Sequence, residues 1–132
     1  MKTYLLDSYA ILAWLQDEEG ADKVEALLEG AQKKKVTILA NIINIGEVYY
    51  RIAKTKTEEK AEEIMEKIRM LPIKIVSCKD ELVYKAARIK AKYPVAYADA
   101  FAIATAIDNQ AVIISGDPEL ASVKKIVKVE WV

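Results

Sequence analysis

The sequence predicts a single α/β domain over residues 1–132, built on a mainly parallel sheet with helices on both faces. Two observations lead to this fold class. Short runs rich in β-branched and aliphatic residues alternate with amphipathic stretches of helical period. The stretches between successive runs are long enough for the helical crossovers that parallel strands require. With four Gly and three Pro, and with no repeat, low-complexity tract or linker, the chain gives no indication of a second domain.

The first part of the chain is expected to fold as strand, helix, helix and strand. The strands are predicted at residues 3–6 and 36–40, which are short β-rich runs flanked by charged or polar residues. Residues 8–16 and 22–32 each place their apolar side chains on one stripe at helical spacing. Both stretches are therefore predicted to be amphipathic helices that cover the sheet.

The middle of the chain is expected to hold two consecutive helices. Asn41 is a plausible N-cap for a helix over residues 41–54. Thr55 followed by Glu58 fits a capping box, which predicts a further helix to about Met70. The apolar positions of this second helix also predict a surface for a protein partner.

The last part is predicted to continue the alternation to the end of the chain. Strands are expected at residues 73–76, 112–115 and 127–132, and helices at 80–92 and 97–107. The helix over 97–107 is apolar on nearly all sides, so we expect it to be buried against several neighbours.

Charge and cysteine content exclude several classes of protein. Lys plus Arg and Asp plus Glu both total 20, so the chain as a whole is no polycation for nucleic acid or acidic lipid. The sequence has no histidine, which excludes imidazole bases, Ser-His-Asp triads and His-ligated metals. The lone Cys78 forms no internal disulfide and suits a reducing cytoplasm, where we expect the protein. We identify no signal peptide and no apolar stretch long enough for a membrane span.

Four acidic residues follow or neighbour the expected strand ends. Asp7 follows the first strand and Asp117 follows the fourth, while Glu47 lies about two turns along the helix that leaves the second strand. Asp99 lies near the start of the apolar helix. Because ligands bind at the carboxyl edge of a parallel sheet, these four side chains could converge there.

Each of these acids also has a purely structural interpretation. Asp7, Asp99 and Asp117 occupy positions where Asp is favoured as a helix cap or turn residue. Glu47 has apolar neighbours and no capping role, but Arg51, one turn later, could pair with it. The sequence leaves both interpretations open.

A converging cluster of carboxylates would have one main chemical use. Like charges repel, and a hard divalent cation relieves the repulsion. Oxygen ligands without His or Cys favour Mg²⁺ or Mn²⁺ over Zn²⁺, and such ions activate water for attack on phosphodiesters. Neither GxGxxG nor GxxxxGK[ST] is present, which disfavours nucleotide cofactors. An aspartyl-phosphate enzyme that uses Asp7 and Lys128 stays open as an alternative.

Four segments, in this order and spacing, resemble the motifs of PIN domains. Within that family the likeness is best to the small stand-alone toxins of VapBC toxin–antitoxin pairs, and it covers the whole chain. The segments are Asp7-Ser8 after the first strand, Gly46-Glu47, residues 98–106 and residues 115–120.

This resemblance implies a five-stranded parallel sheet and a Mg²⁺- or Mn²⁺-dependent endoribonuclease. Its metal ligands would be Asp7, Glu47, Asp99 and Asp117, assisted by the hydroxyl of Ser115 at a position where the family often has threonine. It also implies a homodimer, and a cognate VapB-like antitoxin that inserts a segment near the acidic site. A non-catalytic PIN-like module that binds RNA or protein is the alternative.

Contacts to an RNA substrate are predicted at four positions. Ser8 follows Asp7, and Arg51 follows Glu47 on its helix. Arg88 and Lys92 precede the loop that leads to the apolar helix, where they could meet phosphates.

Overall fold

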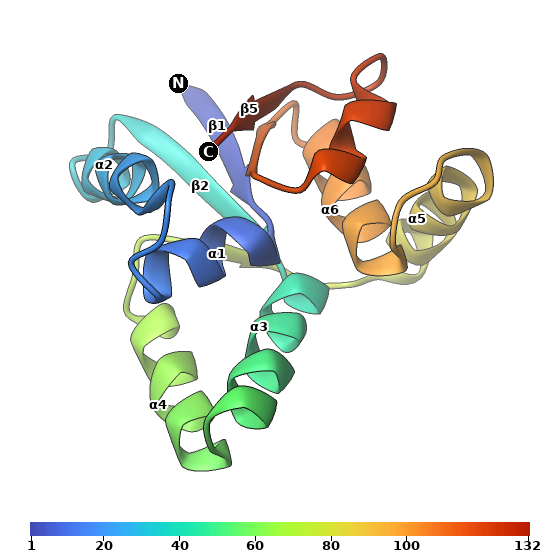
Figure 1. Ribbon diagram of the computed structural model, residues 1–132. Helices are drawn as coiled ribbons and strands as arrows, with labels where there is room; N and C mark the ends of the chain where they lie inside the picture. The colour runs from blue at the N-terminus through green and yellow to red at the C-terminus, as the bar shows by residue number, and fades with distance from the viewer.

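The computed structural model describes residues 1–132 and contains a five-stranded, wholly parallel sheet with helices on both faces (Figure 1). This confirms the predicted α/β class and the strand number. The strand order is β3-β2-β1-β4-β5. The strands are β1 (Lys2–Leu6), β2 (Val36–Asn41), β3 (Lys74–Val76), β4 (Val112–Ser115) and β5 (Val129–Trp131).

The six α-helices lie close to their predicted positions, and a short 3₁₀ helix follows β4. Their bounds are α1 (Ser8–Leu15), α2 (Ala21–Gln32), α3 (Ile42–Thr55), α4 (Glu58–Arg69), α5 (Asp80–Lys92), α6 (Tyr97–Asp108) and η1 (Pro118–Val123). Residues 99–106 of α6 are all buried, as its apolar sequence predicts. No helix has the combination of length and apolar character that crossing a bilayer requires.

The start of α4 differs from the prediction. Asn41 caps α3 as expected, accepting a hydrogen bond from the Ile43 amide at 2.8 Å. The capping box at Thr55 is wrong, because Thr55 is still the last residue of α3 and its hydroxyl donates to the Arg51 carbonyl. Thr57 is the N-cap of α4 instead, and its side chain accepts from the Lys60 amide at 3.0 Å.

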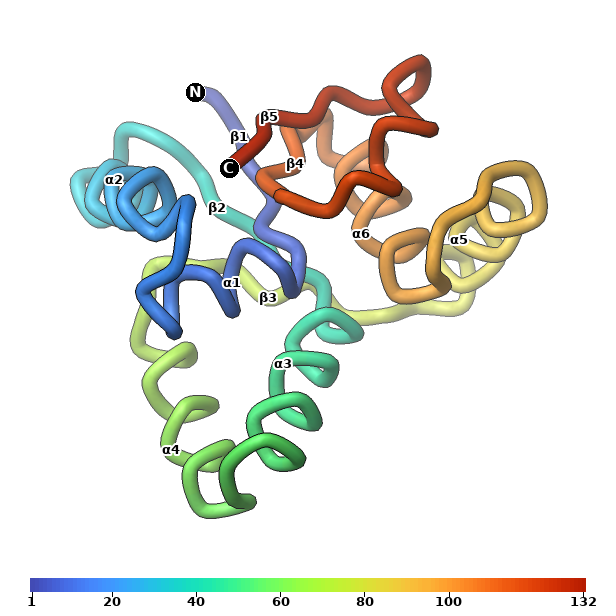
Figure 2. The backbone as a smooth tube through the Cα atoms, viewed as in Figure 1, coloured from blue at the N-terminus to red at the C-terminus, as the bar shows by residue number.

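Alternating side chains of the strands divide the core into two halves. Leu5, Leu39 and Ile113 pack with α5, α6 and the 3₁₀ helix on one face. Leu6 and Ile38 belong to the other half, against α1 to α4. Figure 1 shows these two groups of helices on opposite sides, and in Figure 2 the chain crosses between them after β3.

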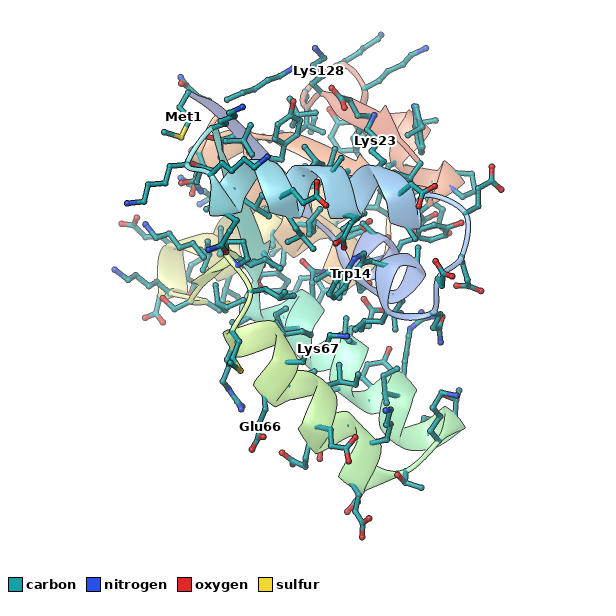
Figure 3. All side chains as sticks on the ribbon, turned by 90° about the vertical axis from the view of Figure 1, so that its left-hand side faces the viewer. Met1, Trp14, Lys23, Glu66, Lys67 and Lys128 are labelled. Atoms are coloured by element: carbon teal, nitrogen blue, oxygen red, sulfur yellow. The ribbon has the colours of Figure 1, made fainter.

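Trp14 connects three helices of the α1–α4 layer (Figure 3). Its indole nitrogen donates to Glu25 of α2, and the Lys67 amine of α4 lies 5.1 Å from the centre of its ring. α3, which carries Glu47, packs in the same layer through its buried residues Ile45, Val48 and Ile52.

The parallel register places the ends of the two central strands side by side. Leu6 of β1 pairs with Ile114 of β4, so Asp7 and Ser115 are next in line on neighbouring strands. β2 flanks β1 on the other side and leads directly into α3. The chain segments that carry Asp7, Asp117 and Glu47 therefore leave the sheet at one edge.

Candidate active site

One pocket of about 260 Å³ brings together the four acids singled out from the sequence. Asp7, Glu47, Asp99 and Asp117 all line it, although they come from four different parts of the chain. The other lining residues are Ser8, Tyr9, Arg51, Ala96 and Glu119. Larger pockets elsewhere lack this concentration of carboxylates.

Asp7 serves as a helix cap and a pocket residue at once. Its Oδ1 accepts a hydrogen bond from the Ala10 amide at 2.9 Å, which caps α1, and only 1% of the residue is exposed. Burial raises the pKa of Asp7 to about 7, and the negative charges of Asp117 and Glu47 add to the rise. A hydrogen bond with Ser115 and the Ala10 amide oppose it without cancelling it.

Asp99 does not cap a helix, so the structural interpretation that the sequence allowed for it is wrong. The N-cap of α6 is Ala96, which offers no side-chain hydrogen bond, and Asp99 lies in the first turn, 7% exposed. Burial is the main reason that the pKa of Asp99 is raised to about 7, and repulsion from Asp117 and Asp7 contributes to the rise. Unlike Asp7, Asp99 receives no hydrogen bond that lowers its pKa.

Glu47 is held in place by two side chains. The Ser8 hydroxyl donates to its Oε1, and an Arg51 guanidinium nitrogen lies 3.3 Å from its Oε2. The predicted ion pair between Glu47 and Arg51 is therefore present. It does not remove Glu47 from the pocket, because both residues line it.

The segment after β4 supplies the last predicted acid and one that sequence reasoning missed. Asp117 Oδ1 accepts from the Glu119 amide at 3.0 Å and caps the 3₁₀ helix, and the Asp117 amide donates to the buried Ser115 hydroxyl oxygen. Carboxylate oxygens of Asp99, Asp117 and Glu119 lie within 4.8 Å of one another. Glu119 was not selected because nothing in its local sequence separates it from an ordinary first-turn acid.

A polar seam between α3 and α6 positions the acids of both helices. The Asn41 amide donates to the Thr105 hydroxyl at 2.9 Å, and the Asn44 amide donates to the Ala98 carbonyl at 3.2 Å. Asn44 is fully buried, and its Oδ1 has no partner. The spacing of Asn41 and Asn44 on one face of an apolar helix was the available indication of this seam.

The predicted substrate contacts divide into two groups. Ser8 and Arg51 line the acidic pocket. Arg88 instead lines a separate hollow on the surface of α5 and α6, and Lys92 is an exposed residue at the end of α5 that does not line the acidic pocket. The structure therefore does not bring Arg88 and Lys92 to the four acids.

The donors of the pocket suit a hard divalent cation. Five carboxyl groups and one guanidinium line it, with no histidine or thiol among them. Burial raises the pKa of two of these carboxyls, Asp7 and Asp99, to about 7, and the neighbouring carboxylates contribute to the rise. Oxygen donors of this kind match Mg²⁺ or Mn²⁺.

Comparison with known structures finds the same fold in several toxin–antitoxin proteins. VapBC2 from Rickettsia felis, bound to a DNA fragment from its promoter, matches with a TM-score of 0.74 at 16% identity, covering 98% of each chain. DNA-bound VapBC from Salmonella typhimurium also scores 0.74 at 16% identity, over 99% of this chain and 98% of that one. VapBC-1 from nontypeable Haemophilus influenzae scores 0.72 at 15% identity, over 97% and 96% of the two chains.

Sequence comparison gives the family itself. No curated protein sequence matches the chain significantly. The family model described as "PIN domain" matches residues 4–126, which include all four predicted acids and nearly every element of the fold. The chain belongs to the PIN domain family.

Proposed function

We propose that the acidic pocket is the active site of an endoribonuclease that depends on Mg²⁺ or Mn²⁺. One observation carries the proposal: carboxylates from four parts of a PIN domain meet in one pocket, and two of them have a pKa raised to about 7. Carboxylates that repel one another at close range gain most from a divalent cation.

Asp7, Asp99 and Asp117 would hold the cation, and Glu47 would bind it or orient its water. When bound, the ion supplies Lewis-acid activation of water and neutralises charge at the phosphodiester. Ser8 fixes the rotamer of Glu47 by its hydrogen bond. The Ser115 hydroxyl orients the chain at Asp117 by accepting a hydrogen bond from its amide.

RNA would meet positive charge at one point of the pocket. Arg51 is the cation among the lining residues, and 56% of its side chain is exposed despite the contact with Glu47. A guanidinium in that position can donate to a phosphate oxygen while still neighbouring Glu47. Ser8, at the pocket wall, is the second substrate contact proposed here.

Cleavage assays with matched variants test this function. Purified protein with Mg²⁺ should cut single-stranded RNA, and chelation of the metal should stop it. Asp99→Asn should lower the rate at least about 100-fold, as is typical when a charge-stabilising group is removed. Asp108→Asn is the control, because Asp108 lies on the same helix but pairs with Lys85 at 2.7 Å outside the pocket. Unchanged rates in both Asp7→Asn and Asp99→Asn would reject the assignment.

The second part of the proposal is that this nuclease is the cytoplasmic toxin of a toxin–antitoxin pair and forms a homodimer. Solved structures described as VapBC complexes share its fold over nearly the whole chain. An apolar groove of about 540 Å³ between α3 and α4 offers surface for an antitoxin, with Ile42, Tyr49 and Met65 among its lining residues. Co-purification with the product of a small neighbouring gene tests the pairing, and sedimentation tests the dimer.

A non-catalytic binding module is the second candidate, because several acids have structural partners. Asp7 and Asp117 cap helices, and Glu47 contacts Arg51. A Mg²⁺ titration separates the two candidates. A catalytic cluster should raise the unfolding temperature as Mg²⁺ is added, since the ion binds the folded state, whereas acids used only as caps should give no such rise.

A further inference from the structure

Tyr9 is an exposed aromatic residue on the wall of the acidic pocket. It is the second residue of α1 and follows Asp7 and Ser8, which line the same pocket. Ser8 and Ala10 on either side are buried, whereas 46% of Tyr9 is exposed. Nothing in the core explains an aromatic ring at this place.

The tip of the Tyr9 ring is held by the chain that carries Ser115 and Asp117. A Cβ added to Gly116 would lie 2.3 Å from Tyr9 Cε1 and 2.6 Å from Cζ. Gly116 does not have a positive φ, so glycine here provides space rather than an unusual backbone conformation. The ring therefore lies directly against Gly116, the residue between Ser115 and Asp117.

Charge alone cannot hold RNA in this pocket. Five carboxyl groups and one guanidinium line it, so its formal charge stays negative even with one divalent cation bound. Base stacking is the main uncharged source of affinity for single strands, because every base has an aromatic face. The half-exposed ring of Tyr9 is the aromatic surface available among the lining residues.

We propose that Tyr9 stacks on the base of a nucleotide next to the phosphodiester that the acidic pocket receives. This inference rests on the proposed ribonuclease function and adds to it a residue that binds substrate. The ring would set which nucleotide sits beside the acids, and Gly116 would keep the space that the ring needs.

Binding of a labelled single-stranded oligoribonucleotide tests the proposal. The full chain carries Asp99→Asn throughout, so that the RNA stays intact. Tyr9→Leu keeps an apolar side chain but removes the aromatic face, and we expect about 5- to 150-fold weaker binding. Tyr9→Phe should bind within about twofold, because it keeps the ring. Tyr84→Leu is the control, since Tyr84 is an exposed tyrosine of α5 outside the pocket.

A series of oligoribonucleotides, each with one abasic position, gives a second readout, and its first measurement needs only the chain that retains Tyr9. An abasic site at one position should weaken binding to the chain that retains Tyr9. The same abasic site should cause no further weakening in Tyr9→Leu. Equal loss at every position, or full affinity in Tyr9→Leu, would overturn the proposal.

The same measurements separate this inference from the proposed function. If the natural chain cuts RNA but Tyr9→Leu leaves the affinity for RNA unchanged, only the stacking proposal is rejected, and the ribonuclease function stands. If the natural chain neither binds nor cuts RNA, the ribonuclease function is rejected, and the stacking proposal with it.

Discussion

Replacing Asp7 with Asn should stabilise the metal-free protein at neutral pH and weaken its stabilisation by Mg²⁺. Asp7 is 1% exposed, and its carboxylate loses hydration on folding. Asn keeps the oxygen that accepts from the Ala10 amide and is an equally good N-cap. The substitution therefore removes the buried charge while retaining the structural role.

The size of the effect follows from the pKa. The pKa of Asp7 rises from an ordinary 3.8 to about 7, chiefly through burial. At 1.36 kcal/mol for each pKa unit, the ionisation of Asp7 above pH 7 should lower the free energy of unfolding by about 4 kcal/mol. The folded state binds this proton more tightly than the unfolded state, so the cost is absent below pH 4 and grows as the pH rises to about 7. Asp7→Asn should remove that cost.

Urea unfolding with a metal chelator, at pH 4 and at pH 8, measures this difference. The two proteins should be equally stable at pH 4, and Asp7→Asn should be more stable by about 2–4 kcal/mol at pH 8. Adding Mg²⁺ at 100 times its Kd should stabilise the natural chain by about 2.7 kcal/mol and the variant by less. A stability difference that is the same at both pH values would refute the burial argument.

Two further predictions concern positions that fix the helices around the pocket. Thr57→Ala should lower the unfolding free energy by about 1 kcal/mol, because it removes the N-cap of α4, whereas Thr55→Ala, as control, should change it by less. Equal losses in the two threonine variants would contradict the assigned cap. Asn44→Ala should lower the unfolding free energy, measured in urea, by about 0.5–1.5 kcal/mol, because it removes the hydrogen bond from the buried Asn44 amide to the half-buried Ala98 carbonyl. A more stable Asn44→Ala protein would show instead that the unpaired Oδ1 of Asn44 is the larger penalty.

The sequence was sufficient for the elements whose apolar pattern extends over several turns or a whole strand. β4 and α5 match their predicted bounds, and the burial of α6 follows from its nearly continuous apolar composition. β4 and α6 bury most of their residues, and α5 buries one apolar stripe, so local pattern and tertiary packing favour the same structure. The convergence of the acids was also predictable, because parallel strands end at one edge.

The sequence was insufficient where the exact boundary of a helix, or the contact of a side chain with a distant part of the chain, decides the outcome. Thr55 and Thr57 both precede acidic residues, and only the length of α3 decides which one caps α4. Arg88 lies on the α5 face turned toward α6, away from the acids, and that orientation depends on packing between two helices. Glu119 joins the carboxylate cluster because the chain turns into a 3₁₀ helix after Asp117.

The sequence seemed to offer two exclusive interpretations for each acid, a helix cap or a pocket residue, and the structure shows that Asp7 and Asp117 are both at once. A carboxylate has two oxygens with about four lone pairs, and an N-cap bond occupies only one of these. In Asp7 and Asp117 the cap bond is made by Oδ1, which fixes the rotamer while the side chain still lines the pocket. If a cation binds as proposed, these two acids would already be oriented by their cap bonds. Asp99 caps no helix, so its carboxylate is the one of the three aspartates that no cap bond orients.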